Sequence, residues 1–426
     1  MDVSKPLRGF VLVATLILLS ACGSDDKTVE TVFPEETTCQ QNRVENQFLV
    51  TWKSGLISME IAANRDEFVE DFLKENLEKI EYVQYDQWIE PSPQPEPLLQ
   101  TQTIITDSLI YGPAQLDASA AWSRGVRGQG VLVAVIDSGV DISHSQLRDQ
   151  IDFNLGESGL DSDGKDKSTN GVDDDGNGLV DDYAGYDFYE GQSLQKSLDG
   201  SDSHGTHVAG IIAAAHDDMT TDPSKVQGIA PESKILPLRF IGPNGGLLSD
   251  SIKAIDYAIS RGARVINASW GGSSCSKTLE QKIQSLSREG VLFVAAAGNN
   301  HSNIDKLFEF PASFNLPTQI TVGATTQNLN QADFSNYGDV RVHIFAPGHR
   351  IVSTLPNDTL GEMSGTSMSA PFISGVAALL LSARPTASIQ EVRSAILNSV
   401  TIRSDYRNST QGRVNVRNAI DYLESH

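Results

Sequence analysis

Three residues of the kinds that serine hydrolysis requires stand at the ends of apolar segments in this chain. Asp137 follows the apolar run 131–136, His204 begins a Gly- and Ala-rich apolar segment, and Ser367 precedes the apolar run 372–381. A serine hydroxyl becomes a nucleophile when an imidazole takes its proton and a carboxylate orients that imidazole. The three residues therefore predict a serine hydrolase, provided that the fold brings them into one cleft.

The sequence around Ser367 is Gly365-Thr366-Ser367-Met368-Ser369-Ala370-Pro371. It predicts a tight turn that opens a buried helix. Backbone N–H groups at a helix start have no partner within the helix, so they can donate to an oxyanion that develops beside them. The same stretch also fits an ordinary core helix capped by Ser or Thr, and the rest of the chain decides between the two interpretations.

Apolar strands alternate with amphipathic helices from about residue 109 onward. This alternation predicts an α/β fold with a parallel sheet. Active sites in such sheets gather at the carboxyl ends of the strands, which is where Asp137 lies. The predicted strands are 131–136, 265–270, 291–297 and 319–324, and the predicted helices are 207–215, 249–261, 278–289 and 370–383.

Three segments resemble the signatures of the subtilisin-like serine proteases, or subtilases, and they occur in that family's order of Asp, His and Ser. They are Val-Ile-Asp-Ser-Gly-Val-Asp at 135–141, His-Gly-Thr-His-Val-Ala-Gly at 204–210 and Gly-Thr-Ser-Met-Ser-Ala-Pro at 365–371. The resemblance covers about residues 109–397. It implies a three-layer subtilisin-like α/β fold with a mainly parallel central sheet.

The same resemblance implies a role for each catalytic residue. Ser367 is expected to be the nucleophile, His204 the general acid and base, and Asp137 the residue that orients His204. Asn299, which follows the predicted strand 291–297, resembles the asparagine that donates to the oxyanion. His207 lies one helical step after His204, but no third metal ligand is evident, and the resemblance implies a structural role for it.

The resemblance also implies a groove that binds the substrate as an extended strand. One segment resembles the strand that pairs with the substrate backbone, and another resembles one wall of the first specificity pocket. Backbone pairing between edge strands holds a peptide whatever its sequence, although the glycines also fit an ordinary loop. The residues concerned are Gly245, Gly246, Leu247, Ser269, Trp270 and Gly271.

Glu309 lies in a segment, 308–312, that resembles the base of the same pocket. A carboxylate in that position would favour Lys or Arg next to the scissile bond. This preference is a hypothesis, and its alternative is a glutamate that only faces solvent.

An acidic stretch at 170–182 has the pattern of a calcium loop. Oxygen-bearing side chains alternate before Gly178, which supplies the sharp turn of such loops. The twelfth position is Ala184 rather than glutamate, so the stretch is not an EF-hand, and a solvated acidic loop is the alternative. The expected ligands of this structural Ca²⁺ are Asp173, Asp175, Asn177, Leu179, Asp181 and Asp182.

The N-terminus is typical of an exported protein. Lys5 and Arg8 precede the apolar run 10–19, which is too short for an ordinary transmembrane helix. The ending Leu-Ser-Ala-Cys at 19–22 resembles a bacterial lipobox, which implies cleavage before Cys22 and lipidation of its thiol. An ordinary signal peptide with a chance cysteine remains the alternative.

Residues 46–97 have a strand–helix–strand pattern, with strands at 48–52 and 80–85 and a helix at 66–77. By the family resemblance this is a propeptide that templates folding and inhibits the enzyme, and cleavage between about residues 96 and 116 would release the mature protease. The expected regions are a signal peptide at 1–21, a tether at 22–45, a small α+β propeptide domain at 46–97, a linker at 98–108 and a peptidase domain at 109–426.

Composition limits the partners. The formal net charge is −23, with 32 basic and 55 acidic residues, and a polyanion such as nucleic acid is therefore not an expected partner. The expected partners are an extended peptide or protein substrate, the chain's own propeptide, and a membrane through a lipid on Cys22, in a protein expected to be a monomer. Export would allow Cys39 and Cys275 to pair, but two free thiols are an open alternative.

The sequence thus favours a serine endopeptidase made as a zymogen, located in the bacterial cell envelope or released after propeptide cleavage. An inactive binding module with the same fold is a second hypothesis, and the four intact catalytic positions count against it. A third is peptide ligation or cyclisation, which requires a device that excludes water from the acyl-enzyme, and the sequence contains no clear insertion of that kind.

Overall fold

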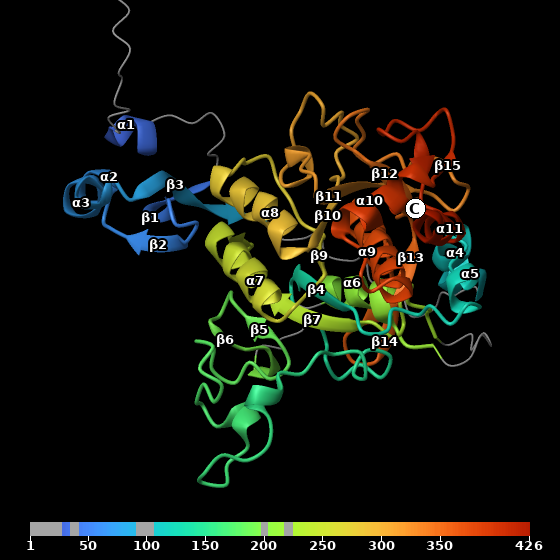
Figure 1. Ribbon diagram of the computed structural model, residues 1–426, viewed down its shortest axis with the longest axis horizontal. Helices are drawn as coiled ribbons and strands as arrows, with labels where there is room; N and C mark the ends of the chain where they lie inside the picture. Colours follow the sequence, from blue (N-terminus) through green and yellow to red (C-terminus); the bar gives the residue numbers. More distant parts are fainter. Residues whose placement is uncertain (1–27, 35–41, 91–105, 197–202, 217–224) are drawn as a thin grey trace, which may run out of the picture.

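The computed structural model describes residues 28–34, 42–90, 106–196, 203–216 and 225–426 (Figure 1). Most of these residues build a central sheet with strand order β15-β16-β12-β11-β10-β9-β4-β7-β5-β6. Six neighbouring strands of this sheet, β12, β11, β10, β9, β4 and β7, all run parallel. The strands of this sheet are β4 (Leu132–Asp137), β5 (Tyr186–Asp187), β6 (Gln192–Ser193), β7 (Lys234–Arg239), β9 (Val265–Ala268), β10 (Leu292–Ala296), β11 (Gln319–Thr325), β12 (Ile344–Pro347), β15 (Thr401–Ile402) and β16 (Gly412–Arg413).

Both faces of this sheet are covered, and the residues of β4 show why. Val133 and Val135 belong to one apolar core, whereas Ala134 and Ile136 belong to another. Alternate residues of a strand point to opposite faces, so a strand with apolar residues at every position needs helices on both sides. The α/β fold with a mainly parallel, covered sheet is therefore confirmed.

The first of these cores includes helices α6 and α9, and the second includes α7 and α8. Helix α9 is long and apolar enough for a membrane span, but 89% of that window is buried inside the protein. It is therefore a core helix. The helices of this part of the chain are α4 (Thr106–Gln115), α5 (Ser119–Trp122), α6 (Ser203–Ala213), α7 (Leu248–Ser260), α8 (Lys277–Glu289), α9 (Thr366–Ala383), α10 (Ile389–Asn398) and α11 (Val416–Ser425). Short 3₁₀ helices lie at Leu155–Glu157, Lys167–Thr169, Leu194–Lys196 and Ala312–Phe314. The strands β13 (Ile351–Leu355) and β14 (Thr359–Met363) form a separate hairpin.

The N-terminal unit is an antiparallel sheet with a helical segment, as the pattern of residues 46–97 predicts. Its apolar core includes Phe33, Phe48 and Phe68, all about 1% exposed or less. Its elements are α1 (Val29–Val32), β1 (Arg43–Trp52), β2 (Ile57–Ile61), β3 (Ile80–Ile89) and a continuous helical stretch made of α2 (Arg65–Phe68), a π-helical turn (Val69–Leu73) and α3 (Lys74–Asn76).

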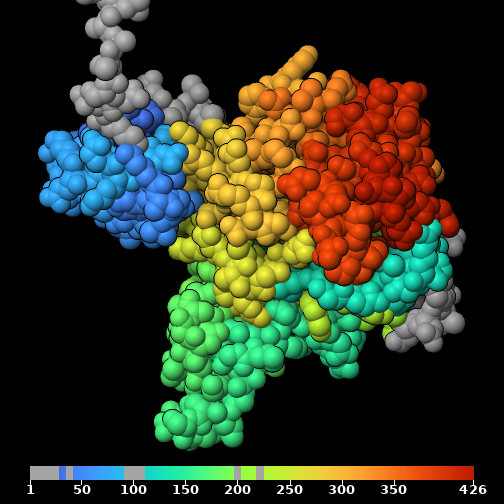
Figure 2. Space-filling view, viewed as in Figure 1, coloured from blue at the N-terminus to red at the C-terminus, as the bar shows by residue number. Residues whose placement is uncertain are grey.

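This unit lies against α7 and α8 (Figures 1 and 2). Its strand β3 pairs in antiparallel fashion with β8 (Gly246–Leu247) of the larger unit, so the four-stranded sheet β2-β1-β3-β8 crosses between the two. Two side chains of β3 cap helices of the larger unit. Gln84 Oε1 accepts from Thr278 N–H at 3.1 Å, and Asp86 Oδ1 accepts from Ser249 N–H at 3.0 Å. Unpaired N–H groups in the first turns of α7 and α8 thus find acceptors in the N-terminal unit.

The predicted elements correspond to β4, β9, β10, β11 and helices α6 to α9, with shifted ends. Two helices begin earlier than predicted, α6 at Ser203 rather than 207 and α9 at Thr366 rather than 370. Glycine and serine near both starts disfavour helix by propensity, and packing overrides that preference. The sequence did not predict β7, where Pro237 lies within the strand. The proline is tolerated because β5 pairs only with Leu238 and Arg239 on that side.

Candidate active site

Asp137 and His204 lie together beneath the protein surface. Asp137 ends β4, and His204 is the second residue of α6. His204 Nδ1 lies 2.8 Å from Asp137 Oδ1, and the two residues are 2% and 0% exposed. The start of α6 approaches β4 this closely only because residue 205 is glycine, since a Cβ there would lie 2.0 Å from the carbonyl oxygen of Gly139.

Asp137 has one fully engaged oxygen and one without a donor. Its Oδ1 also accepts from Ser138 N–H at 2.7 Å, which fixes the carboxylate plane. Its Oδ2 is buried and has no hydrogen-bond partner in the described part of the chain. The carboxylate is thus aimed at one ring nitrogen of His204, which leaves the other, Nε2, available for proton transfer.

Ser367 is the second residue of α9, which packs against α6. Its Oγ donates to the carbonyl oxygen of Ser269 at 3.0 Å, and Ser269 Oγ donates back to the carbonyl oxygen of Ser367 at 2.8 Å. No hydrogen bond joins Ser367 to His204 among the described residues. The hydroxyl therefore has to rotate toward His204 before it can react, and catalytic hydrogen bonds of this kind often tighten only with substrate present.

Asn299 and the start of α9 present two donors to one space. Asn299 Oδ1 accepts from Thr366 N–H at 2.8 Å and from Thr366 Oγ at 3.0 Å, so its Nδ2 is left to point away from the helix. A Cβ placed on Gly365 would lie 3.5 Å from Asn299 Nδ2 and 3.6 Å from Ser367 N. Two nitrogen atoms that can donate therefore lie near the same point beside the start of α9, and an oxyanion hole needs such a pair of donors.

His207 is buried and takes no part in this constellation. Its Nε2 lies 3.0 Å from the carbonyl oxygen of Ile351 and 3.1 Å from that of Gly361, where it ties α6 to the β13–β14 hairpin. Burial, together with the proximity of His204, lowers the pKa of His207 to about 3. A neutral ring held by two carbonyl groups agrees with a structural role.

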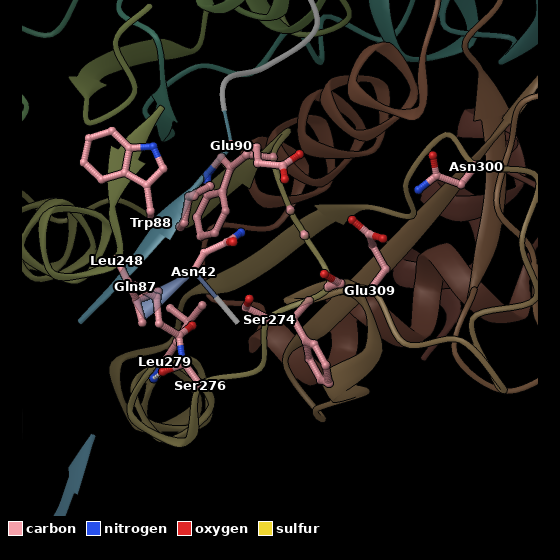
Figure 3. Close-up of a pocket in the computed structure, with 16 residues that line it drawn as sticks. Asn42, Gln87, Trp88, Glu90, Leu248, Ser274, Ser276, Leu279, Asn300 and Glu309 are labelled. Atoms are coloured by element: carbon pink, nitrogen blue, oxygen red, sulfur yellow. Dashed lines mark hydrogen bonds between the residues drawn. The ribbon is translucent and has the colours of Figure 1, made fainter. Parts of the chain in front are cut away.

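A cavity of about 180 Å³ leads to Ser367, and its walls include the predicted specificity residues Ser269, Trp270 and Gly271. Asn299 and Glu309 line the same cavity. So does Glu90, the residue that follows β3 of the N-terminal unit. In Figure 3, which shows the adjoining pocket, Glu90 and Glu309 lie on opposite sides.

The other predicted substrate segment pairs with the N-terminal unit. Gly246 and Leu247 form β8, where Ile89 is opposite Gly246 and Trp88 is opposite Leu247. Gly245 adopts a φ of +104°, and a Cβ there would lie 2.3 Å from the carbonyl oxygen of Ile89. Strand β3 thus occupies the edge to which the sequence assigned an extended substrate.

The acidic stretch 170–182 lies on an arm that projects from the body of the molecule (Figure 2). Oxygen atoms of Asp175 and Asp182 lie within 4.8 Å of each other and of Glu157. Glu157 and Asp182 are 0% exposed, and Glu157 Oε2 has no hydrogen-bond partner among the described residues. Burial raises the pKa of Glu157, and the nearby carboxylates of Asp182 and Asp175 act in the same direction.

Four of the six predicted calcium ligands lie outside this cluster of three. The oxygens of Asp173 accept from the N–H groups of Gly176, Asn177 and Gly178, and Asp181 Oδ1 accepts from Gly171 N–H. Asn177 Nδ2 donates to Asp182, and Leu179 packs against the second apolar core. Glu157 was not predicted, because it precedes Asp175 by 18 residues and no local spacing rule connects them.

Cys275 is disulfide-bonded, so the alternative of a free thiol at this position is wrong. Its bonding partner lies outside the described residues, as do Cys39, Cys22 with the predicted signal peptide, and residues 91–105, which include most of the predicted linker.

The chain is similar to known proteins over most of its length. Residues 128–418 match the model of the subtilase family. The chain is 33% identical to subtilisin DY of Bacillus licheniformis over 72% of its own length and 97% of that protein, and 33% identical to thermitase of Thermoactinomyces vulgaris over 73% and 96%. It is also 33% identical to M-protease of Shouchella clausii, of which it spans 66%.

Proposed function

The chain belongs to the subtilase family of serine proteases, and from that membership we propose that it is an endopeptidase that uses Asp137, His204 and Ser367 and is made as a zymogen. The observation that carries the proposal is the arrangement at the helix starts. His204 Nδ1 lies 2.8 Å from Asp137 Oδ1, and Ser367 is the second residue of α9, where its backbone nitrogen and Asn299 Nδ2 lie near the same point beside Gly365.

In the proposed reaction, His204 Nε2 takes the proton of Ser367 Oγ as this oxygen attacks the carbonyl carbon of the substrate. The negative charge that develops on the carbonyl oxygen enters the space beside Gly365, where Asn299 Nδ2 and Ser367 N–H donate to it. His204 then gives its proton to the leaving amine, and water hydrolyses the acyl-enzyme by the same steps in reverse order. Asp137 stabilises the imidazolium throughout.

A direct test is hydrolysis of casein by the purified protein freed of residues 42–90, before and after treatment with an organophosphorus inhibitor. We expect hydrolysis that the inhibitor abolishes. If the protein freed of residues 42–90 hydrolysed nothing, the inactive binding module would be the better account. If it joined peptides in preference to hydrolysing them, the ligation hypothesis would replace this one.

Replacing Asn299 by alanine should lower kcat roughly 10²- to 10³-fold, the size of loss found for an oxyanion donor in subtilisin itself. KM should change little, because the donor acts mainly on the charge that forms in the transition state. Steady-state kinetics with one peptide measures both quantities. Asn303→Ala is a suitable control, because Asn303 Oδ1 only accepts from Asp305 N–H within the loop. Equal effects of the two substitutions would exclude an oxyanion role for Asn299.

The N-terminal unit is proposed to be the inhibitory propeptide. Three contacts support this assignment: β3 covers β8, Gln84 and Asp86 cap the helices beside the groove, and Glu90 reaches the cavity of Ser367. Because Glu90 already lines that cavity, the cut that frees the enzyme is proposed to fall soon after it, earlier than the range of 96–116 expected from the sequence.

Export and anchoring rest on residues 1–27, which lie outside the described part of the chain. We infer from the Lys/Arg-flanked apolar run and the ending at Cys22 that the precursor is exported and lipidated. The enzyme would be released from that anchor, or held near it by the propeptide, after the chain is cut. A monomer is proposed, since the proposed machinery comes from one chain.

A structural Ca²⁺ is proposed at Glu157, Asp175 and Asp182. Oxygen ligands suit this hard cation, and the buried, unpaired Oε2 of Glu157 supports the fit. A bound cation would offset the repulsion among the three carboxylates. It would thereby hold the arm that connects β4 to α6, the elements that carry Asp137 and His204.

Removal of calcium with a chelator should therefore lower the melting temperature by roughly 5 °C or more, since a ligand at about 100 times its Kd stabilises the folded state by about 2.7 kcal/mol. Differential scanning calorimetry in chelator and in excess Ca²⁺ measures the shift. Glu157→Gln should remove most of it, whereas the exposed Glu289→Gln should not. Identical melting curves for the wild-type protein in both buffers would rule the site out.

A further inference from the structure

The cavity that leads to Ser367 is acidic. Among the described residues that line it and the adjoining pocket, Glu90 and Glu309 are the only Asp, Glu, His, Lys or Arg side chains. The rest of the described lining of this cavity is uncharged, and it mixes polar residues such as Ser269 and Asn299 with apolar ones such as Trp270 and Ala296. A cation that entered the cavity would therefore meet carboxylate without any competing positive charge.

Backbone hydrogen bonds fix the position of Glu309 at the wall of this cavity, and two neighbouring glycines leave space for its side chain. Its N–H donates to Ser313 Oγ at 3.0 Å, and its carbonyl oxygen accepts from Ser313 N–H. A Cβ on Gly298 would lie 3.1 Å from Glu309 Cγ, and one on Gly271 would lie 3.4 Å from Glu309 Oε1. Glycine at both positions thus makes room for the glutamate side chain between the two cavity walls.

The carboxylate of Glu309 has no hydrogen bond or ion pair in the described part of the chain, although the residue is only partly exposed. Burial, with the nearby charge of Glu90, raises the pKa of Glu309 to about 7. A half-buried carboxylate without a donor is costly unless a ligand supplies one. In the structure the residue that reaches toward it is Glu90, which carries the same charge.

We propose that Glu309 makes this cavity a cation pocket, so that the protease cuts after Lys or Arg. The proposal rests on the proposed endopeptidase function and names its substrate class. Lys and Arg side chains can donate to the Glu309 carboxylate, whereas an apolar side chain would leave it unpaired. Glu90 is also acidic and brings no positive charge to the pocket. Residues 80–123 contain no Lys or Arg, so this preference does not direct the cut that frees the enzyme.

Two peptides that differ only by arginine or citrulline before the scissile bond test the proposal. Citrulline has nearly the shape of arginine but no charge, so the ratio of their kcat/KM values isolates the charge. We expect the wild-type protein to prefer arginine roughly 10- to 100-fold, the range typical of a hydrogen bond to a charged group. Glu309→Gln should bring the ratio close to one, and Glu309→Asp should retain part of it. The exposed Glu424→Gln is the matched control and should leave the ratio unchanged.

The pH dependence of the same ratio gives a second readout, in which pH effects that are common to both peptides cancel. The ionised form of Glu309 attracts the cation, and this form dominates above its pKa. The preference should therefore be full well above pH 7 and should decline as the pH falls through the pKa, which is about 7 with Glu90 opposite and lower once Glu90 has left. Glu309→Gln should show no such decline.

A wild-type ratio near one, or a ratio that Glu309→Gln leaves unchanged, would overturn the cation pocket while leaving the endopeptidase function intact. A wild-type protein that cuts peptides with phenylalanine or leucine at that position better than either test peptide would also overturn it. Failure to hydrolyse any peptide would instead overturn the proposed function, and the cation pocket with it.

Discussion

Replacing Ser367 by alanine should lower kcat by about 10⁶-fold, the size of loss that subtilisin shows when its nucleophile is removed. Alanine retains the helix start, because it has the highest helix propensity and the Gly365 turn is unchanged. The substitution removes only the attacking oxygen and one hydrogen bond to Ser269.

The control for this variant is Ser369→Ala. Ser369 lies on the same helix, is buried, and donates from Oγ to the carbonyl oxygen of Ala346 at 3.2 Å. Its loss removes a hydrogen bond of the same kind but no attacking atom, so kcat should stay within a few-fold of wild type. Initial rates with a chromogenic peptide cover the required range. Activity of Ser367→Ala within tenfold of wild type would contradict the assignment of the nucleophile.

Replacing Asp137 by asparagine should lower kcat by about 10⁴-fold at neutral pH, as in the Asp-to-Asn variant of a serine protease triad. An amide nitrogen at the position of Oδ1 would donate to His204 and would oppose Ser138 N–H, which now donates to that atom. The reverse orientation places the NH₂ group at Oδ2, where no buried partner is present among the described residues. Either orientation also removes the charge that stabilises the imidazolium.

The matched variant for this prediction is Asp256→Asn. Asp256 is an exposed residue of α7, and its carboxylate pairs with Lys282 of α8. Its kcat should remain close to wild type. Comparable KM values for Asp137→Asn and wild type would show that the substrate groove is intact. If the Asp137→Asn protein kept a tenth of the wild-type kcat or more, Asp137 would not be the residue that orients His204.

The sequence predicted those strands, helices and catalytic segments that a short stretch of residues is enough to identify. Apolar runs at every position marked β4 and β10 as buried parallel strands, and the segments around Asp137, His204 and Ser367 predicted one constellation. Pro237 concealed β7, because proline argues against a central strand unless the neighbouring strand is short. The predicted ranges of α6 and α9 begin four residues too late, because glycine and serine near the true starts have low helix propensity. Burial rather than propensity stabilises these starts.

The unpredicted parts of the site depend on contacts between distant segments. Glu157 joins Asp175 and Asp182 only through the folding of the arm. Thr366 orients the amide of Asn299 across 67 positions. Glu90 reaches the cavity of Glu309 because β3 adds to β8, and the sequence predicted neither that pairing nor the presence of two carboxylates in one cavity. Like-charged neighbours of this kind cannot be read from spacing, because spacing describes only one element at a time.

The central claim is that Ser367 attacks the substrate with the help of His204 and Asp137. Its most direct test is peptide-level mass spectrometry after reaction with a fluorophosphonate, performed in parallel on the wild-type and Ser367→Ala proteins. The account predicts one stoichiometric adduct on the Oγ of Ser367 in the wild-type protein and none in the variant. An adduct on another serine, or equal labelling of the two proteins, would contradict it.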